Sequence, residues 1–300
     1  MTLLARRLLL TVTGLGVFTL AGCGQNPPPR PAWPTLTVDL NVPSRTLRLP
    51  LTVAQNLNLF ADQHIQLRWS HSPSAPVHVS WTPGSWPIVG SIAQGPDFYL
   101  AAPEPDPHFR LRALNHLPVD YSGTLEPARP LIDSIMALNQ VRPDLEPLPW
   151  PKVQSLWSRR QLPWAIVTLA QLRELQQKDR RTVILNWLGA STGPIPAVTI
   201  SGNSPHLAQF LAALNMALWY IHTTPAHTVA AVANPARAAS WRQIVMQGQH
   251  NHLWPSSIQV SPQEYNRARA LYGLRGSPGW PPYYSGVLNS PSNQAFKATY

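Results

Sequence analysis

Cysteine is almost absent from this chain, which has one, Cys23, in 300 residues. An internal disulfide needs two cysteines, so none can form, and a zinc site built from several thiolates is excluded as well. Charged residues are also scarce, at 12 % of the chain, although the net charge is +10. Lysines and arginines form no run longer than pairs such as Arg159-Arg160, so the sequence does not favour nucleic-acid binding.

Signatures of several enzyme classes are also missing. The sequence has neither a Gly-rich phosphate loop nor a G-x-S-x-G elbow. Asp120, Glu126 and Asp133 lack a partner that would define acid–base chemistry. The histidines, such as His250 and His252, have no carboxylate or cysteine at a usual metal-ligand spacing. We therefore expect no catalytic residues, no metal site and no cofactor.

The amino terminus has the features of an export signal. Arg6 and Arg7 precede an apolar run of about 13 residues, Leu8 to Leu20, whereas a membrane-spanning helix needs about 20. The tetrapeptide Leu20-Ala21-Gly22-Cys23 follows and resembles the bacterial lipobox. We predict a signal peptide at residues 1–22 and lipidation of Cys23, since two acyl chains hold a protein firmly at a membrane. The alternative is an ordinary secretory signal with an incidental cysteine.

A proline-rich segment separates this signal from the folded body. Residues 23–34 contain five prolines and little that could pack, so we interpret them as a tether. From Thr35 the pattern alternates between strands and helices. Residues 35–40 and 65–69 alternate as strands around a helix that begins near Pro50, which is a βαβ unit and implies a parallel sheet.

The same reasoning gives the later elements. We predict helices at 81–94, 130–138, 168–177 and 205–222, and a helix that Ser261 opens with a capping box. We predict strands at 98–100, 109–114, 164–167 and 182–187. The alternation indicates an α/β protein.

Three segments resemble one known family. Residues 49–60 with 65–67 resemble the strand, apolar helix and second strand that open the substrate-binding lipoproteins of the taurine, alkanesulfonate, nitrate and thiamine-precursor type. Residues 91–100 resemble a helix-turn-strand of that family, and residues 205–225 its long late helix. Asn58 and His64 stand where the family usually has glycine; asparagine tolerates the left-handed conformation of such positions.

The resemblance implies a type 2 periplasmic-binding-protein fold, in which two α/β lobes enclose a cleft and the chain crosses between them twice. We expect lobe one at residues 35–103 and 192–300, and lobe two at residues 104–191. The ligand is expected where helix amino termini and carboxyl ends of strands from both lobes meet.

Candidate ligand-binding residues are those that bring hydroxyls, backbone N–H groups, a charge or an aromatic ring to that cleft. They are Arg48, Thr82, Gly84, Ser85, Ser122, Gly123, Thr124, Trp164, Ser191 and Thr192. Each also has a structural interpretation. The serines and threonines could only cap helices or shape a hinge, the arginine could be solvated, and the tryptophan could belong to the core.

The first function hypothesis is a monomeric solute-binding lipoprotein of an ABC importer on the outer face of the cytoplasmic membrane. It would deliver a small organic ligand, anionic or aromatic, to a permease. A second is a degenerate binding protein that serves as an accessory envelope lipoprotein. A third is an enzyme on the same fold, such as the futalosine-pathway enzymes or yeast-type pyrimidine synthases; those are cytoplasmic, so the export signal argues against it.

Overall fold

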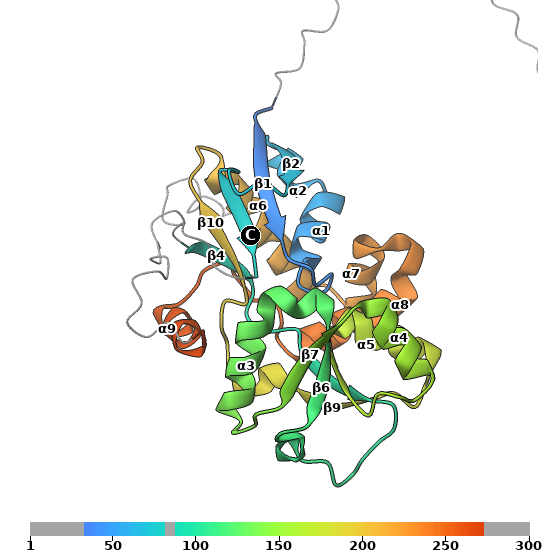
Figure 1. Cartoon of the computed structure of the whole chain (residues 1–300). Helices are drawn as coiled ribbons and strands as arrows, with labels where there is room; N and C mark the ends of the chain where they lie inside the picture. Colours follow the sequence, from blue (N-terminus) through green and yellow to red (C-terminus); the bar gives the residue numbers. More distant parts are fainter. Residues whose placement is uncertain (1–32, 82–87, 273–300) are drawn as a thin grey trace, which may run out of the picture. The chain divides into compact units, whose positions relative to one another are not determined.

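Two five-stranded sheets organise the chain. The computed structural model describes residues 33–81 and 88–272. The first sheet has the order β2-β1-β3-β10-β4 (Figure 1). Its strands are β1 (Thr35–Asn41), β2 (Gln66–Ser70), β3 (Val77–Ser80), β4 (Ile88–Ala93) and β10 (Val198–Gly202). β1 pairs in parallel with β2 and β3, whereas β10 runs antiparallel to β3 and β4.

The second sheet repeats this arrangement, with the order β7-β6-β8-β5-β9. Its strands are β5 (Tyr99–Ala102), β6 (Pro118–Ser122), β7 (Asp144–Leu148), β8 (Ala165–Val167) and β9 (Val183–Trp187). β6 lies parallel to β7 and β8, and β5 is antiparallel to β8 and β9. Two mixed sheets, each built from βα units, confirm the predicted two-lobed α/β fold class.

Helices connect these strands and pack beside them. The α-helices are α1 (Leu49–Asn56), α2 (Leu59–Asp62), α3 (Arg129–Leu138), α4 (Trp150–Ser158), α5 (Leu169–Lys178), α6 (Leu207–Thr223), α7 (Ala226–Ala233), α8 (Ala238–His250) and α9 (Pro262–Leu271). The 3-10 helices are η1 (Leu111–Leu114), η2 (Gly123–Ala128), η3 (Leu188–Ser191) and η4 (Pro235–Arg237).

The opening helices pack against α6. The rings of Phe60 on α2 and Phe210 on α6 stack at 5.6 Å with planes 12° apart, and both side chains are buried. Asn58 and His64 flank α2, and both adopt the left-handed conformation with φ of 57°. The structure therefore requires this conformation at both positions that the resemblance assigned to glycine. Histidine and asparagine are several-fold enriched among the non-glycine residues that adopt it.

The chain passes between the sheets twice, at residues 94–98 and again at residues 188–197. β5 belongs to the second sheet, whereas the predicted boundary at 103/104 had placed this strand in lobe one. The first crossing therefore comes before residue 99, and by sheet membership β5 belongs with lobe two.

Two predicted elements are wrong. The segment predicted as a helix at 81–94 contains β4, whose six residues are all buried. A fully buried strand has no alternation, so its apolar run cannot be distinguished from a buried helix. Residues 109–114, predicted as a strand, contain the 3-10 helix η1. By contrast, the Ser261 capping box is confirmed, since Ser261 Oγ accepts from Glu264 N at 3.2 Å.

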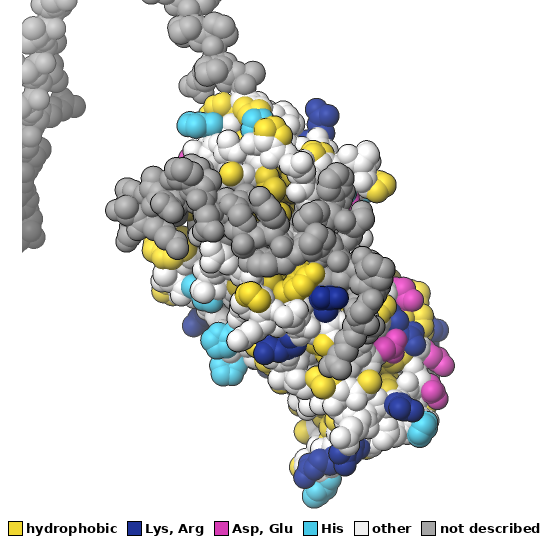
Figure 2. Space-filling model, turned by 90° about the vertical axis from the view of Figure 1, so that its left-hand side faces the viewer, with side chains coloured by type: hydrophobic (Ala, Val, Ile, Leu, Met, Phe, Trp, Pro, Cys, Tyr) yellow, Lys and Arg dark blue, Asp and Glu magenta, His cyan; other side chains and the backbone are white. Residues whose placement is uncertain are grey.

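Charge is sparse on the surface as well as in the sequence. Figure 2 shows one face, on which acidic side chains gather toward one side and have lysines or arginines beside them. Arg160 and Arg181 on the second lobe both pair with Glu104 and Asp179. Such exposed pairs contribute little to stability, about 0–1 kcal/mol.

Candidate binding site at the carboxyl ends of the second sheet

A buried carboxyl joins the two sheets at the first crossing. Asp97 is 0 % exposed. Its Oδ2 accepts a 2.6 Å hydrogen bond from Ser44 Oγ, in the loop after β1, and its Oδ1 accepts a 2.9 Å bond from Leu169 N, at the start of α5. One side chain in the crossing segment is thus bonded to a loop of the first sheet and to a helix of the second.

Burial dominates the electrostatics of this carboxyl. It raises the pKa of Asp97 from 3.8 to about 7, although the hydrogen bonds from Ser44 and Leu169 lower it in part. The amino terminus of a helix favours a negative charge. Asp97 occupies that position on α5, so this helix end already has a carboxyl group from the chain itself. Sequence reasoning did not select Asp97 as a site residue, although it is a lone acid within a long apolar stretch.

The first turn of α5 links Asp97 to residues of β6. Thr168 and Gln171 form a capping box, with Thr168 N donating to Gln171 Oε1 at 3.0 Å. Gln171 Nε2 then donates to Ser122 Oγ at 2.8 Å and lies 3.1 Å from Thr124 Oγ1. The structure therefore brings together two predicted site residues, Ser122 and Thr124, and adds Gln171, which sequence reasoning missed.

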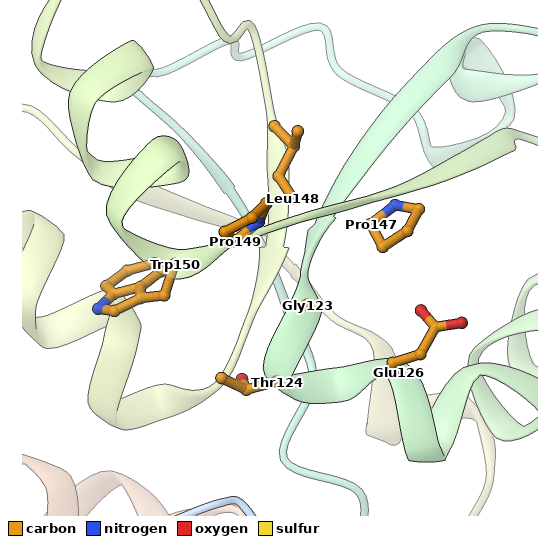
Figure 3. A pocket seen from close by; sticks show the side chains of 7 residues that line it. All are labelled: Gly123, Thr124, Glu126, Pro147, Leu148, Pro149 and Trp150. Atoms are coloured by element: carbon orange, nitrogen blue, oxygen red, sulfur yellow. The ribbon is translucent and has the colours of Figure 1, made fainter.

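A pocket lies where β6 and β7 end. Its volume is about 480 Å³, within the range of about 300–1,000 Å³ usual for small-molecule sites. Figure 3 shows its lining: Gly123, Thr124, Glu126, Pro147, Leu148, Pro149 and Trp150. Parallel strands commonly present ligand sites outside their carboxyl ends. We call this cavity the β6–β7 pocket.

The polar groups of the β6–β7 pocket are held by neighbours. The carboxylate of Glu126 accepts a hydrogen bond from Tyr121 OH. The guanidinium of Arg129 lies 5.4 Å from the centre of the Tyr121 ring and also donates to its hydroxyl at 3.2 Å. Trp150 is fixed from the other side, because its Nε1 donates to Glu174 Oε2 at 3.0 Å. An aromatic ring, proline walls, one hydroxyl and one carboxylate therefore surround the same space.

Two predicted residues do not join this group. Trp164 precedes β8, and its Nε1 donates to the carbonyl of Pro118 at 3.2 Å. Pro118 begins β6 while Ser122 ends it, so Trp164 lies at the amino-terminal ends of these parallel strands, away from the pocket at their carboxyl ends. Its indole N–H fixes the start of a strand, and the prediction that it stacks on a ligand in the cleft is not supported. Arg48 stands at the amino end of α1, where its Nε donates to the carbonyl of Val42.

The two predicted residues of the second crossing bond to the backbone and to Asn139, the residue after α3. Ser191 Oγ accepts from Asn139 Nδ2 at 2.8 Å and donates to Leu188 O at 3.2 Å. Thr192 is buried, and its hydroxyl lies 2.9 Å from the carbonyl oxygen of Gly189. These contacts shape the crossing segment, which is the structural alternative that the sequence left open for both residues.

The remaining predicted residues, Thr82, Gly84, Ser85 and Cys23, lie outside the described residues. Within residues 33–81 and 88–272, no three or more His, Cys, Asp or Glu side chains lie close enough together to hold a metal ion. In the same ranges no helix has the length and apolar character to span a membrane.

Comparison with known proteins gives structural neighbours only. No protein-family model and no curated protein matches the chain. Among solved structures, the alkanesulfonate-binding protein SsuA from Xanthomonas axonopodis pv. citri, bound to MOPS, has 14 % identity and a TM-score of 0.58, covering 83 % of this chain and 96 % of that one. The zinc-bound ligand-binding component of an ABC-type import system from Staphylococcus aureus has 8 % identity and a TM-score of 0.59, covering 86 % and 99 %.

The structural neighbours also include an enzyme. The desulfurization enzyme DSZB has 12 % identity and a TM-score of 0.58, covering 87 % of this chain and 99 % of that one. At such identities the match concerns the fold. The two sheets have matching strand orders, the chain crosses between them twice, and the solved neighbours are covered almost end to end. The chain therefore has the two-lobed periplasmic-binding-protein fold, as in solute-binding components of ABC importers.

Proposed function

We propose that this protein is an exported solute-binding lipoprotein of an ABC importer, which takes a small organic molecule into the β6–β7 pocket and presents it to a permease. The observation that carries the proposal is the pocket itself. Thr124, Glu126 and Trp150 face one cavity of about 480 Å³ at the carboxyl ends of parallel strands, and Gln171 and Tyr121 hold two of them in place.

The lining defines the solute class. Trp150 and the prolines offer flat apolar surface, while Glu126 accepts hydrogen bonds and Thr124 can donate or accept one. We infer a solute with an aromatic or other flat apolar part and at least one N–H or O–H donor. An anionic group, the other possibility the sequence offered, would have to lie away from the carboxylate of Glu126.

Lipid anchoring is the second part of the proposal. It rests on the sequence around Cys23, where a basic start, a short apolar run and small residues precede the cysteine. A lipid on Cys23 would keep the domain at the outer face of the cytoplasmic membrane, beside the permease. The proline-rich residues that follow suit a spacer between the lipid and the domain.

A binding role is favoured over an enzymatic one by the same pocket. Glu126 is the one titratable side chain among the described residues that line it, and acid–base catalysis usually needs a positioned partner.

One observation favours a second candidate, an accessory lipoprotein that binds no solute. Asp97 occupies the amino end of α5 and bonds both sheets through the chain's own atoms, so contact between the lobes does not require a ligand.

Thermal unfolding of the purified protein against a solute panel tests the proposal. The panel should contain sulfonates, nitrate, thiamine precursors, aromatic acids and aromatic amines. A solute at 100 times its dissociation constant adds about 2.7 kcal/mol to stability, which is a shift of a few degrees. A saturable shift with one class supports solute binding, whereas a panel without any shift favours the accessory role.

A further inference from the structure

A second, larger cavity lies between helices that belong to different lobes. Its volume is about 740 Å³. One wall is α5, which follows a strand of the second sheet, and the other is formed by η4 and the start of α8. Arg45, from the loop after β1, completes the lining. We call this space the α5–α8 cavity; it shares no lining residue with the β6–β7 pocket.

Three arginines line the α5–α8 cavity without a carboxylate partner: Arg45, Arg173 and Arg237. All 13 aspartates and glutamates of the chain lie in its described part. The ion pairs found there are made by other cations, among them Arg129, Arg160 and Arg181. Among the described residues, no carboxylate therefore forms an ion pair with these three arginines.

The one acid in the lining is already engaged. Glu174 Oε2 accepts hydrogen bonds from Trp150 Nε1 at 3.0 Å and from Gln154 Nε2 at 3.3 Å. Both donors lie on α4, so they hold the carboxylate toward that helix. Glu174 consequently forms no ion pair with Arg173, although the two residues are neighbours on α5.

Arg173 has one N–H group without a hydrogen-bond acceptor among the described residues. Its Nη1 donates to Gln176 Oε1 at 2.6 Å, but its Nε is buried and has no hydrogen-bond partner. Burial lowers the pKa of this arginine. A buried donor without an acceptor is unfavourable, so the described part of the chain does not fully satisfy the hydrogen-bonding capacity of this guanidinium.

Positive charge also accumulates beside Arg45. The pKa of Arg48 is lowered first by burial and then by the positive charge of Arg45. A negative ligand would relieve this repulsion. Guanidinium groups bind carboxylates and phosphates through paired N–H donors, which makes several unpaired arginines around one space a recognisable site for such groups.

We propose that the α5–α8 cavity binds a small soluble anion with at least two negative charges on phosphate or carboxylate groups. Arg45, Arg173 and Arg237 hold these groups, and Trp241 contacts the rest of the ligand. Because the arginines come from elements of both lobes, the bound anion also joins the lobes. The proposal does not depend on which solute, if any, occupies the β6–β7 pocket.

Calorimetric titration of the full chain tests this site, with inorganic pyrophosphate and citrate as probes and acetate as the monovalent control at constant ionic strength. Arg237 is exposed, so its replacement spares the core. We expect one or both probes to bind the wild type, and Arg237→Gln and Arg173→Gln each to weaken that affinity about tenfold. Arg242→Gln is the matched control, since Arg242 is an exposed arginine of α8 outside the lining; it should leave the affinity unchanged.

Two outcomes overturn the proposal. In the first, neither pyrophosphate nor citrate binds more tightly than acetate. In the second, Arg242→Gln weakens binding as much as Arg237→Gln does, because the anions then respond to the overall positive charge and not to this cavity.

Discussion

The hydroxyl of Ser44 donates a 2.6 Å hydrogen bond to the carboxyl of Asp97, which lies 53 residues later in the chain. Ser44 lies in the loop after β1 of the first sheet, and Asp97 lies in the segment that leaves this sheet for the second. Since the same carboxyl accepts from Leu169 N, three distant segments meet at one buried group. This contact fixes where the chain crosses between the sheets.

The first prediction concerns pH. Burial raises the pKa of Asp97 from 3.8 to about 7, so the native protein binds more protons than the unfolded chain between those values. The stability that this carboxyl contributes is therefore fully present below about pH 4 and is lost as the pH rises through about 7. We expect the free energy of unfolding to fall by up to about 1.4 kcal/mol per pH unit in this window.

Asp97→Asn should remove that dependence. An amide can accept from Leu169 N and donate to Ser44 Oγ, so it resembles the protonated carboxyl. Urea unfolding at pH 5, 6, 7 and 8 compares the two proteins. Equal slopes against pH in wild type and variant would mean that Asp97 is not the group that titrates.

The second prediction concerns Gln171. Gln171→Ala removes half of the capping box and both contacts with the hydroxyls of Ser122 on β6 and Thr124 on η2. We expect the free energy of unfolding to decrease by about 1–3 kcal/mol, measured in urea. Gln243→Ala, on an exposed position of α8, is the control and should change stability by less than about 0.5 kcal/mol. Similar losses in both variants would contradict a specific role for Gln171.

The third prediction uses two glycines. Gly202 has φ of +130°, and a Cβ there would lie 2.2 Å from the carbonyl oxygen of Pro76. Gly202→Ala should therefore cost more than about 2 kcal/mol of stability. A Cβ on Gly95 would be at an ordinary 3.6 Å from the Trp187 ring, so Gly95→Ala should cost much less. A Gly202→Ala variant as stable as Gly95→Ala would contradict the pairing of β10 with β3.

The fourth prediction concerns the lipid. Cys23→Ser removes the thiol that would carry the acyl groups, so the exported protein should move from the membrane fraction to the soluble fraction and lose label from radioactive palmitate. Gln25→Ser, in the adjoining tether, should stay with the membrane. Membrane association that persists in Cys23→Ser would point to the alternative of an incidental cysteine.

The sequence allowed the fold class to be predicted because helices with marked ends alternate with strands. Thr168 and Ser261 each open a helix with a capping box whose partner is three residues away. Such signals are local, so they can be identified in the sequence without knowledge of the fold. β4 was missed for the opposite reason, since all of its residues are buried and the pattern contains no polar face.

The site was harder to predict than the fold. Ser122, Gly123 and Thr124 were identified because the sequence indicates a turn that offers hydroxyls and backbone N–H groups, although the strand β6, which ends at Ser122, was not predicted. Glu126 lies on η2 together with Gly123 and Thr124, whereas Trp150 joins them only through the pairing of β6 with β7, which brings Ser122 opposite Leu148. Asp97 was missed because its hydrogen-bond partners, Ser44 and Leu169, lie 53 and 72 residues away in the sequence. No local pattern encodes such distances.

The central claim is that a solute binds in the β6–β7 pocket, and calorimetric titration of wild type and Gly123→Ala tests it most directly. A Cβ on Gly123 would lie 3.2 Å from the carbonyl oxygen of Leu148, which narrows the pocket at the junction of its two walls. The account predicts that one solute class binds the wild type with one molecule per chain and binds the variant at least about tenfold more weakly, a loss of about 1.4 kcal/mol. Equal affinity for both proteins would place the solute elsewhere and contradict the account.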